Sequence, residues 1–160
     1  MTSWHNQGLV IAVQPHGEHG AILTLLTEEL GKCKGYLRGA QSKKTRGVAS
    51  LGNLVSANWQ GRHEDDLGAF TLELEQSYAS RFWNDPLRLQ ALMAAAVLCD
   101  KGLAERQPHP AVFYGFNALL DNMAEDNWGA LYVAWEVALL REMGFGLDLQ
   151  NCAGGGDPSM

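Results

Sequence analysis

The chain has 160 residues, of which 46% are hydrophobic and 19% are charged, and its formal net charge is −6. This composition excludes a disordered protein and is typical of a folded one. No apolar run approaches the roughly 20 residues that span a bilayer, so we expect no membrane association. The three cysteines, Cys33, Cys99 and Cys152, form no Cys-x-x-Cys pair. Their spacing argues against disulfides and structural zinc, and for a cytoplasmic location.

The first 80 residues have a hydrophobic period of two. Alternating apolar and polar residues predict five short strands, near residues 9–13, 21–27, 32–37, 55–60 and 70–75. Glycine-containing turns separate them, and residues 61–68 form an acidic hairpin loop by composition. Five strands in so short a segment predict a closed or nearly closed barrel of the OB type.

After about residue 80 the period changes to 3.6, which predicts three helices, over residues 85–102, 109–123 and 126–143. The third carries few charges, so we expect it to be the central and most buried one. The expected fold is therefore α+β, with an OB-fold β-barrel in residues 1–80 and an α-helical domain in residues 81–150. We expect the two to pack together, and the glycine-rich residues 151–160 to be a flexible tail.

Six cations and no acids fall in residues 31–46, a segment we call the basic stretch. They are Lys32, Lys34, Arg38, Lys43, Lys44 and Arg46. The other 144 residues hold six cations against 18 acids. Glycine, serine and threonine predict that the second half is a mobile polar loop. Such a loop on an acidic protein suits a polyanion, and the alternative is an ordinary solvated loop.

Aromatic residues allow two readings. Tyr36 lies among the cations, where its ring could stack on unpaired bases or fill the barrel. Trp59 is in register with apolar residues of its strand, which favours a place inside the barrel. The aromatic residues of the predicted helices fit a core, and a groove for a partner peptide is the alternative.

Candidate catalytic residues are few. The cluster His16-Gly17-Glu18-His19 has half of the zinc-deaminase pattern but lacks its cysteine pair, so a polar turn is favoured over a metal site. Cys33 stands between two lysines, which would lower its pKa if the thiol is exposed, whereas Cys99 fits a buried hydrophobic position. Neither a nucleophile elbow nor a phosphate-binding glycine motif occurs. We therefore expect no catalytic residue, no metal and no cofactor, and a protein that is not an enzyme.

Two blocks of sequence resemble the RecO recombination-mediator family. The first runs from Gly8-Leu-Val-Ile through residues 16–28 to Gly35-Tyr-Leu-Arg-Gly-Ala. The second is Trp135 to Leu149, containing Gly-Phe-Gly-Leu-Asp-Leu, followed by Cys152-Ala. His109-Pro110 also falls where members of this family often carry a similar pair.

The resemblance implies an OB-fold barrel followed by helices in a bacterial, nucleoid-associated protein. RecO-like proteins bind single- and double-stranded DNA, anneal complementary strands, and work with RecR to load RecA on DNA coated by single-stranded DNA-binding protein. They also bind the acidic C-terminal tail of that protein. Arg38, Lys43, Lys44 and Arg46 match the family's basic DNA-contacting stretch, and Lys32 and Lys34 extend it by charge. The family usually continues well past the Cys152 region, so this chain is either truncated or naturally short.

Three hypotheses follow. The first is a non-enzymatic DNA-binding mediator of recombination, with DNA on the barrel and protein partners on the helices. The second is a protein-interaction adaptor with an OB fold and little DNA binding, which the acidic balance outside the basic stretch favours. The third is a small metal-dependent hydrolase using His16, Glu18 and His19.

Overall fold

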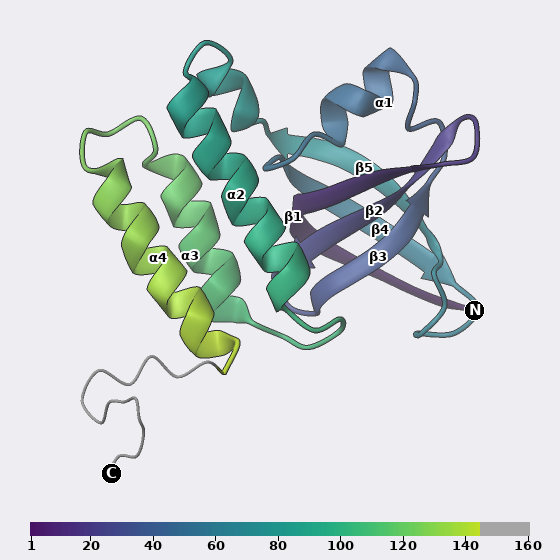
Figure 1. Ribbon diagram of the computed structural model, residues 1–160. Coiled ribbons are helices and arrows are strands. Elements are labelled where there is room, and N and C mark those ends of the chain that lie inside the picture. Colours follow the sequence, from purple (N-terminus) through teal and green to yellow (C-terminus); the bar gives the residue numbers. More distant parts are fainter. Residues whose placement is uncertain (145–160) are drawn as a thin grey trace, which may run out of the picture.

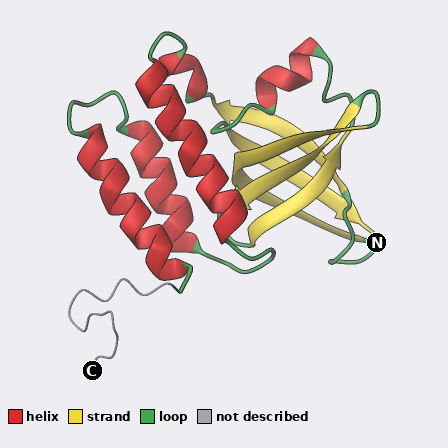
Figure 2. Cartoon of the chain, in the orientation of Figure 1, coloured by secondary structure: helices red, strands yellow, loops and turns green. Residues whose placement is uncertain are grey.

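The computed structural model describes residues 1–144 as a five-stranded β-barrel with a layer of helices packed against one side (Figures 1 and 2). The elements are β1 (Thr2–His16), β2 (Gly20–Thr27), β3 (Gly31–Leu37), α1 (Lys43–Val48), β4 (Leu54–Gly61), β5 (Ala69–Gln76), the 3₁₀ helix η1 (Ala79–Phe82), α2 (Pro86–Gly102), α3 (Pro110–Asp121) and α4 (Trp128–Glu142). The predicted α+β class and the five-stranded barrel are confirmed. The predicted tail, residues 151–160, and the last residues of the predicted helical domain lie outside the described part of the chain.

Strand β1 closes the barrel because it pairs on both of its edges. Its first half lies antiparallel to β4, from Thr2 opposite Gly61 to Leu9 opposite Leu54. Its second half lies antiparallel to β2, ending with His16 opposite Gly20. The strand order is β1-β2-β3-β5-β4, with β3 and β5 parallel. The contact between β3 and β5 is limited to one pair, Tyr36 opposite Ala69, so the start of β3 has an edge that β5 does not cover.

The barrel is filled by the side chains that alternate inward. The largest is Trp59, which is 0% exposed and packs with the buried residues Val10, Leu25 and Phe70. Its indole N–H lies within 3.2 Å of the carbonyl oxygen of Lys34 and 3.0 Å of that of Leu67. The prediction that Trp59 fills the barrel is confirmed.

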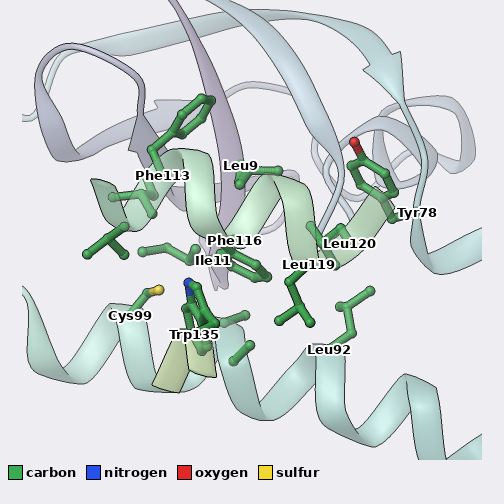
Figure 3. Close-up of a cluster of buried hydrophobic side chains, with 14 of the residues drawn as sticks. Leu9, Ile11, Tyr78, Leu92, Cys99, Phe113, Phe116, Leu119, Leu120 and Trp135 are labelled. Atoms are coloured by element: carbon green, nitrogen blue, oxygen red, sulfur yellow. The ribbon is translucent and has the colours of Figure 1, made fainter. Parts of the chain in front are cut away.

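A second core joins the barrel to the helices. Leu9 and Ile11 of β1 and Leu26 of β2 point out of the barrel and are fully buried against helical side chains such as Leu92 and Phe116. Figure 3 shows Leu9 and Ile11 beside the side chains of α2 and α3. The expected direct packing of the two parts therefore takes place through one face of β1 and β2.

The helices begin where the sequence signals predict. Asp85 caps α2 by accepting a hydrogen bond from the backbone N–H of Arg88, and Pro86 occupies the first turn. The 3.6 period of the sequence predicts one apolar face in and just after α3, and all of its residues are buried: Val112, Phe113, Phe116, Leu119, Leu120 and Met123. For α2 the same period predicts a buried face of Leu89, Leu92, Met93, Ala96 and Val97. That prediction is partly wrong, because Met93 and Val97 are about half exposed while Ala95 and Cys99 are buried.

The expectation that the third predicted helix is the most buried one is wrong. Five residues of α3 are buried, whereas in α4 only Trp135 and Leu139 are. Helix α3 packs against α4 and also contributes Val112, Phe113 and Phe116 to the core shared with β1 and β2, whereas much of the surface of α4 is exposed (Figure 1). None of the helices within residues 1–144 is long and apolar enough to cross a membrane.

The turn between β2 and β3 interlocks with the connection from α2 to α3. Gly31 has a φ of +76°, and a Cβ at this position would collide with the backbone of Gln107. One residue earlier, the N–H of Arg106 donates to the carbonyl of Lys32 at 2.8 Å, and Glu105 bridges to Lys32 in parallel register. The connection between α2 and α3 thus pairs for a short distance, in parallel, with the start of β3.

Replacement of Phe116 by alanine tests the shared core. Phe116 is 0% exposed, so its truncation should lower the free energy of unfolding by roughly 3–5 kcal/mol. Val133→Ala removes apolar atoms from a residue that is 59% exposed and should cost less than about 0.5 kcal/mol. Urea unfolding followed by circular dichroism and tryptophan fluorescence measures both. Equal losses in the two variants would contradict the assignment of the core to α3.

Candidate nucleic-acid interface

The end of the basic stretch, residues 43–46, lies in a helix. Residues 43–48 form α1, which corrects the expectation of a mobile loop there. Ser42 caps the helix, since its hydroxyl accepts a hydrogen bond from the backbone N–H of Thr45 at 3.2 Å. The serine cap was visible in the sequence. The helix was missed because it is short, contains Gly47 and has no buried residue to produce an apolar period.

Four cations of the basic stretch lie exposed around α1. Lys43, Lys44 and Arg46 are on the helix, and Arg38 directly follows β3. The connecting loop is held by Gln41, whose backbone N–H donates to the carbonyl of His19 at 3.2 Å. We call Arg38, Lys43, Lys44 and Arg46 the basic end. Figure 1 shows α1 standing clear of the helical layer, at the end of the barrel where the β1–β2 turn lies.

Lys32 and Lys34 lie apart from the basic end. Strand alternation puts both on the outer face of β3, toward the helices. Lys32 is only 8% exposed, and its Nζ donates to the carbonyl of Asp100 in the last turn of α2 at 2.7 Å. A cation at that position also suits the negative end of the helix dipole. Lys34 forms an ion pair with Glu105 at 3.2 Å.

Tyr36 lies outside the barrel core. Its ring packs over Gly20, at the start of β2, where a Cβ would collide with the phenol. The edge of the ring meets His16, with ring centroids 6.2 Å apart. Tyr36 is half-buried in this position, next to the β1–β2 turn that the Gln41 loop also contacts.

A groove between α1 and β5 opens beside the basic end. Its volume is about 290 Å³. It is lined by Leu37, Arg38, Lys44, Thr45, Val48, Phe70, Thr71 and Leu72. Two cations therefore border a mainly apolar floor, and none of these eight lining residues is acidic. No sequence pattern predicts this groove, because it depends on how α1 lies against β5.

The acidic loop between β4 and β5 faces a different set of cations. Asp65 and Asp66 line a separate groove together with Lys34, Glu105 and Arg106. Three carboxylates and two cations line this groove, so its net charge is negative. Their charges do not enter the lining of the α1–β5 groove.

Within residues 1–144, the structure does not place the candidate catalytic side chains in a catalytic arrangement. Cys33 is inside the barrel, so the exposed thiol whose pKa the flanking lysines would lower is not present, and burial raises the pKa of this thiol. Alternation turns those lysines to the opposite face of β3. Burial also raises the pKa of Cys99 to about 12. Within residues 1–144, no three side chains of the metal-binding types lie close enough together to hold an ion. His19 and Glu18 are exposed, with 3.7 Å between Nε2 and Oε2.

The pair Lys32→Met and Lys34→Met tests the different roles of these two lysines. Loss of the Lys32 ammonium leaves the Asp100 carbonyl without its donor and should lower the free energy of unfolding by about 1–3 kcal/mol. Loss of the half-exposed Lys34–Glu105 pair should cost less than about 1 kcal/mol. Guanidinium unfolding measures both values. A loss for Lys34→Met as large as that for Lys32→Met would refute the helix-capping role of Lys32.

Comparison with known proteins agrees with this architecture. The sequence model described as "Recombination protein O N terminal" matches residues 1–78, and the one described as "Recombination protein O C terminal" matches residues 84–159. "DNA repair protein RecO" of Rhodospirillum centenum is 44% identical over 153 residues, which are 96% of this chain and 61% of the relative. The protein of the same name from Rhodospirillum rubrum is 40% identical over 163 residues, 98% of this chain and 65% of the relative.

A third relative, "DNA repair protein RecO" of Caulobacter sp. strain K31, is 39% identical over 154 residues, with 96% of this chain and 63% of the relative covered. The chain thus spans between three fifths and two thirds of the length of these relatives. The two sequence models between them match nearly all of its residues, in the order barrel then helices. The chain belongs to the RecO family.

Proposed function

We propose that this chain binds DNA through the basic end, as a non-enzymatic mediator of recombination in DNA repair. The observation that carries the proposal is the grouping of four exposed cations around α1 in a chain of net charge −6. Six of the twelve lysines and arginines fall in 16 consecutive residues. Lys32 and Lys34 contact α2 and the segment after it, and the other four make up the basic end. Tyr36 stays part of the proposed surface, since its ring lies between the barrel and the β1–β2 turn.

Phosphate contacts explain why we expect binding to DNA of any sequence, single- or double-stranded. Each cation placed near a phosphate releases condensed counterions, whatever the base sequence. The proposal therefore covers both single- and double-stranded DNA. Annealing follows from the same charge, because cations that neutralise two complementary strands lower the repulsion between them. Lys32 is left out of this surface, since its ammonium is buried against α2.

The protein partners proposed for the helical domain are RecR, the C-terminal tail of single-stranded DNA-binding protein and, indirectly, RecA. The family resemblance is the reason for naming them. The exposed apolar side chains Trp83, Leu87 and Val133 and an apolar groove of about 240 Å³ between α3 and α4 support a protein-binding role for this layer. The division into a barrel of residues 1–80 and a helical domain of residues 81–150 belongs to the same proposal.

An adaptor with an OB fold and little DNA binding is the second candidate. The charge outside the basic stretch favours it, because 18 acids against six cations would repel DNA from most of the surface. The two candidates differ in one measurable property, the salt dependence of DNA binding.

The triple variant Lys43→Ala, Lys44→Ala, Arg46→Ala tests the basic end. If each cation contacts one phosphate, the slope of log affinity against log salt for a single strand should become shallower by roughly 2, at about 0.7 per contact. Fluorescence anisotropy of a labelled oligonucleotide over a salt series measures the slope. The matched control is Arg62→Ala, Arg81→Ala, Lys101→Ala, which removes the same charge from exposed cations elsewhere. Alanine keeps the helical preference of α1 in the variant.

The control should keep the native slope. If both triple variants lose the same slope, net charge and not the basic end determines binding. If the native chain shows no salt-dependent binding, the adaptor is the better description.

A further inference from the structure

Strand β5 has a long edge that no other strand covers. The parallel strands β3 and β5 meet at one pair only, Tyr36 near the end of β3 opposite Ala69 at the start of β5. So short an overlap leaves two edges unpaired, the first residues of β3 and the later residues of β5. Within residues 1–144, residues 71–76 pair with β4 on one side and with no strand on the other. We call this unpaired side of residues 71–76 the β5 edge.

The fold covers the free part of β3 with other groups. The backbone N–H of Arg106 donates to the carbonyl of Lys32 at 2.8 Å, and the indole N–H of Trp59 donates to the carbonyl of Lys34 at 3.2 Å. The β5 edge has no such cover, because no hydrogen bond within residues 1–144 joins the backbone of residues 71–76 to an element other than β4. Of the two edges, the fold therefore closes one and leaves the other accessible.

The α1–β5 groove provides space beside the β5 edge. Leu37 and Arg38 line it and directly follow Tyr36, the residue that pairs with the start of β5, so the groove lies on the unpaired side of β5. Helix α1 forms its opposite wall, and its volume is about 290 Å³. An unpaired strand edge with open space beside it is a site at which an extended peptide can add as a further strand.

The β5 edge presents backbone donors and acceptors at Leu72 and Leu74. The N–H of Tyr36 donates to the carbonyl of Gly68 at 3.0 Å, on one side of its partner Ala69, so a parallel ladder directs the backbone groups of residue 70 toward β3 as well. Alternate residues of a strand direct these groups to the same side, so those of Leu72 and Leu74 point away from β4. An antiparallel strand could exchange two hydrogen bonds with each of them.

The side chains of β5 determine what an added strand must carry on its two faces. On the inner face, Leu72 is half-buried and Leu74 is 42% exposed, so apolar side chains are needed opposite them. On the outer face, Glu73 and Glu75 are exposed and form no salt bridge within residues 1–144. Opposite charges on neighbouring strands stabilise pairing and like charges destabilise it. The added strand should therefore alternate apolar residues with lysine or arginine.

The same charges disfavour a second copy of this chain as the occupant. Two β5 strands paired through their free edges would bring Glu73 and Glu75 of both copies close together, and charges on an edge strand oppose such pairing. At the other end of the groove the border is positive, since Arg38 and Lys44 lie there beside Thr71. An occupant therefore needs a basic part and, at one end, an acidic residue.

We propose that the β5 edge binds an extended segment of a partner protein by strand addition. The segment has apolar residues on its inner face, lysine or arginine beside Glu73 and Glu75, and an acidic residue near Arg38 and Lys44. Backbone hydrogen bonds to β5 supply part of the affinity, and the alternation of side chains supplies the specificity. This surface is on the barrel, apart from the helical layer, and its existence does not depend on DNA binding.

A labelled peptide of sequence Lys-Val-Lys-Val-Thr-Val-Asp, with blocked ends, tests the proposal by fluorescence anisotropy. Antiparallel to β5, its order places the lysines beside the glutamates and the aspartate near the cations. The peptide should bind saturably, and replacement of both lysines by glutamate should weaken binding about tenfold. The double variant Glu73→Lys, Glu75→Lys should reverse this preference. The matched control Glu125→Lys, Asp126→Lys makes the same change of charge at exposed residues between α3 and α4 and should keep the native preference. Thermal unfolding verifies the fold of both variants.

N-methylation of the peptide separates strand pairing from simple charge attraction. In the antiparallel arrangement, the first two valines lie opposite Leu74 and Leu72 and direct their N–H groups at β5. Methylation of both should weaken binding about tenfold, through the loss of two backbone hydrogen bonds. Methylation of the two lysines, whose N–H groups point away from β5, should leave the affinity nearly unchanged.

Three results would overturn the proposal. The first is that the peptide does not bind, and the second is that both methylated peptides bind as well as the parent. The third is a native chain that sediments as a dimer which the peptide does not dissociate, because a second copy would then occupy the β5 edge. None of these results bears on the proposed DNA binding, which is measured separately by its salt dependence.

Discussion

The double pairing of β1 determines most of this architecture. A strand of 15 residues is long enough to pair with β4 along its first half and with β2 along its second. A register shift between Val10 and Ala12 lies where the partners change over. There Val10 points into the barrel, while Leu9 and Ile11 on the other face are buried by the helices. One short segment therefore closes the barrel and supplies the surface on which α2 and α3 pack.

Much of the fold could be predicted from the sequence, because periodicity reports directly on burial. In the strands of the first 80 residues and in α3, the apolar side chains on one face point into a core, so the spacing of apolar residues predicts the element. A different argument, from the low number of charges, failed for α4, where Ala130, Val133 and Ala138 are apolar but exposed. Low charge predicted central burial, yet the position of a helix in a layer depends on its neighbours and not on its own composition.

The candidate site was predictable in its charge and not in its shape. Counting cations located the basic stretch, but a count cannot distinguish an ammonium in water from one bonded to a helix terminus, as in Lys32. Strand alternation on β3 could have predicted part of this separation, since residues 32 and 34 must share a face and Arg38 lies beyond the strand. The α1–β5 groove had no sequence signal, because its walls come from the end of β3, from α1 and from β5.

The interlocking of Gly31 with Gln107 has a consequence for dividing the chain. The two sequence models of the family divide the chain between residues 78 and 84, but the contacts of the β2–β3 turn and of Lys32 cross that division. A fragment ending at residue 80 would leave Leu9, Ile11 and Leu26 as a continuous apolar area in water. It would also lose the backbone partner of the Lys32 carbonyl and the acceptor of the Lys32 ammonium. Contacts that bury side chains of both parts therefore cross the short segment that separates the two matched regions.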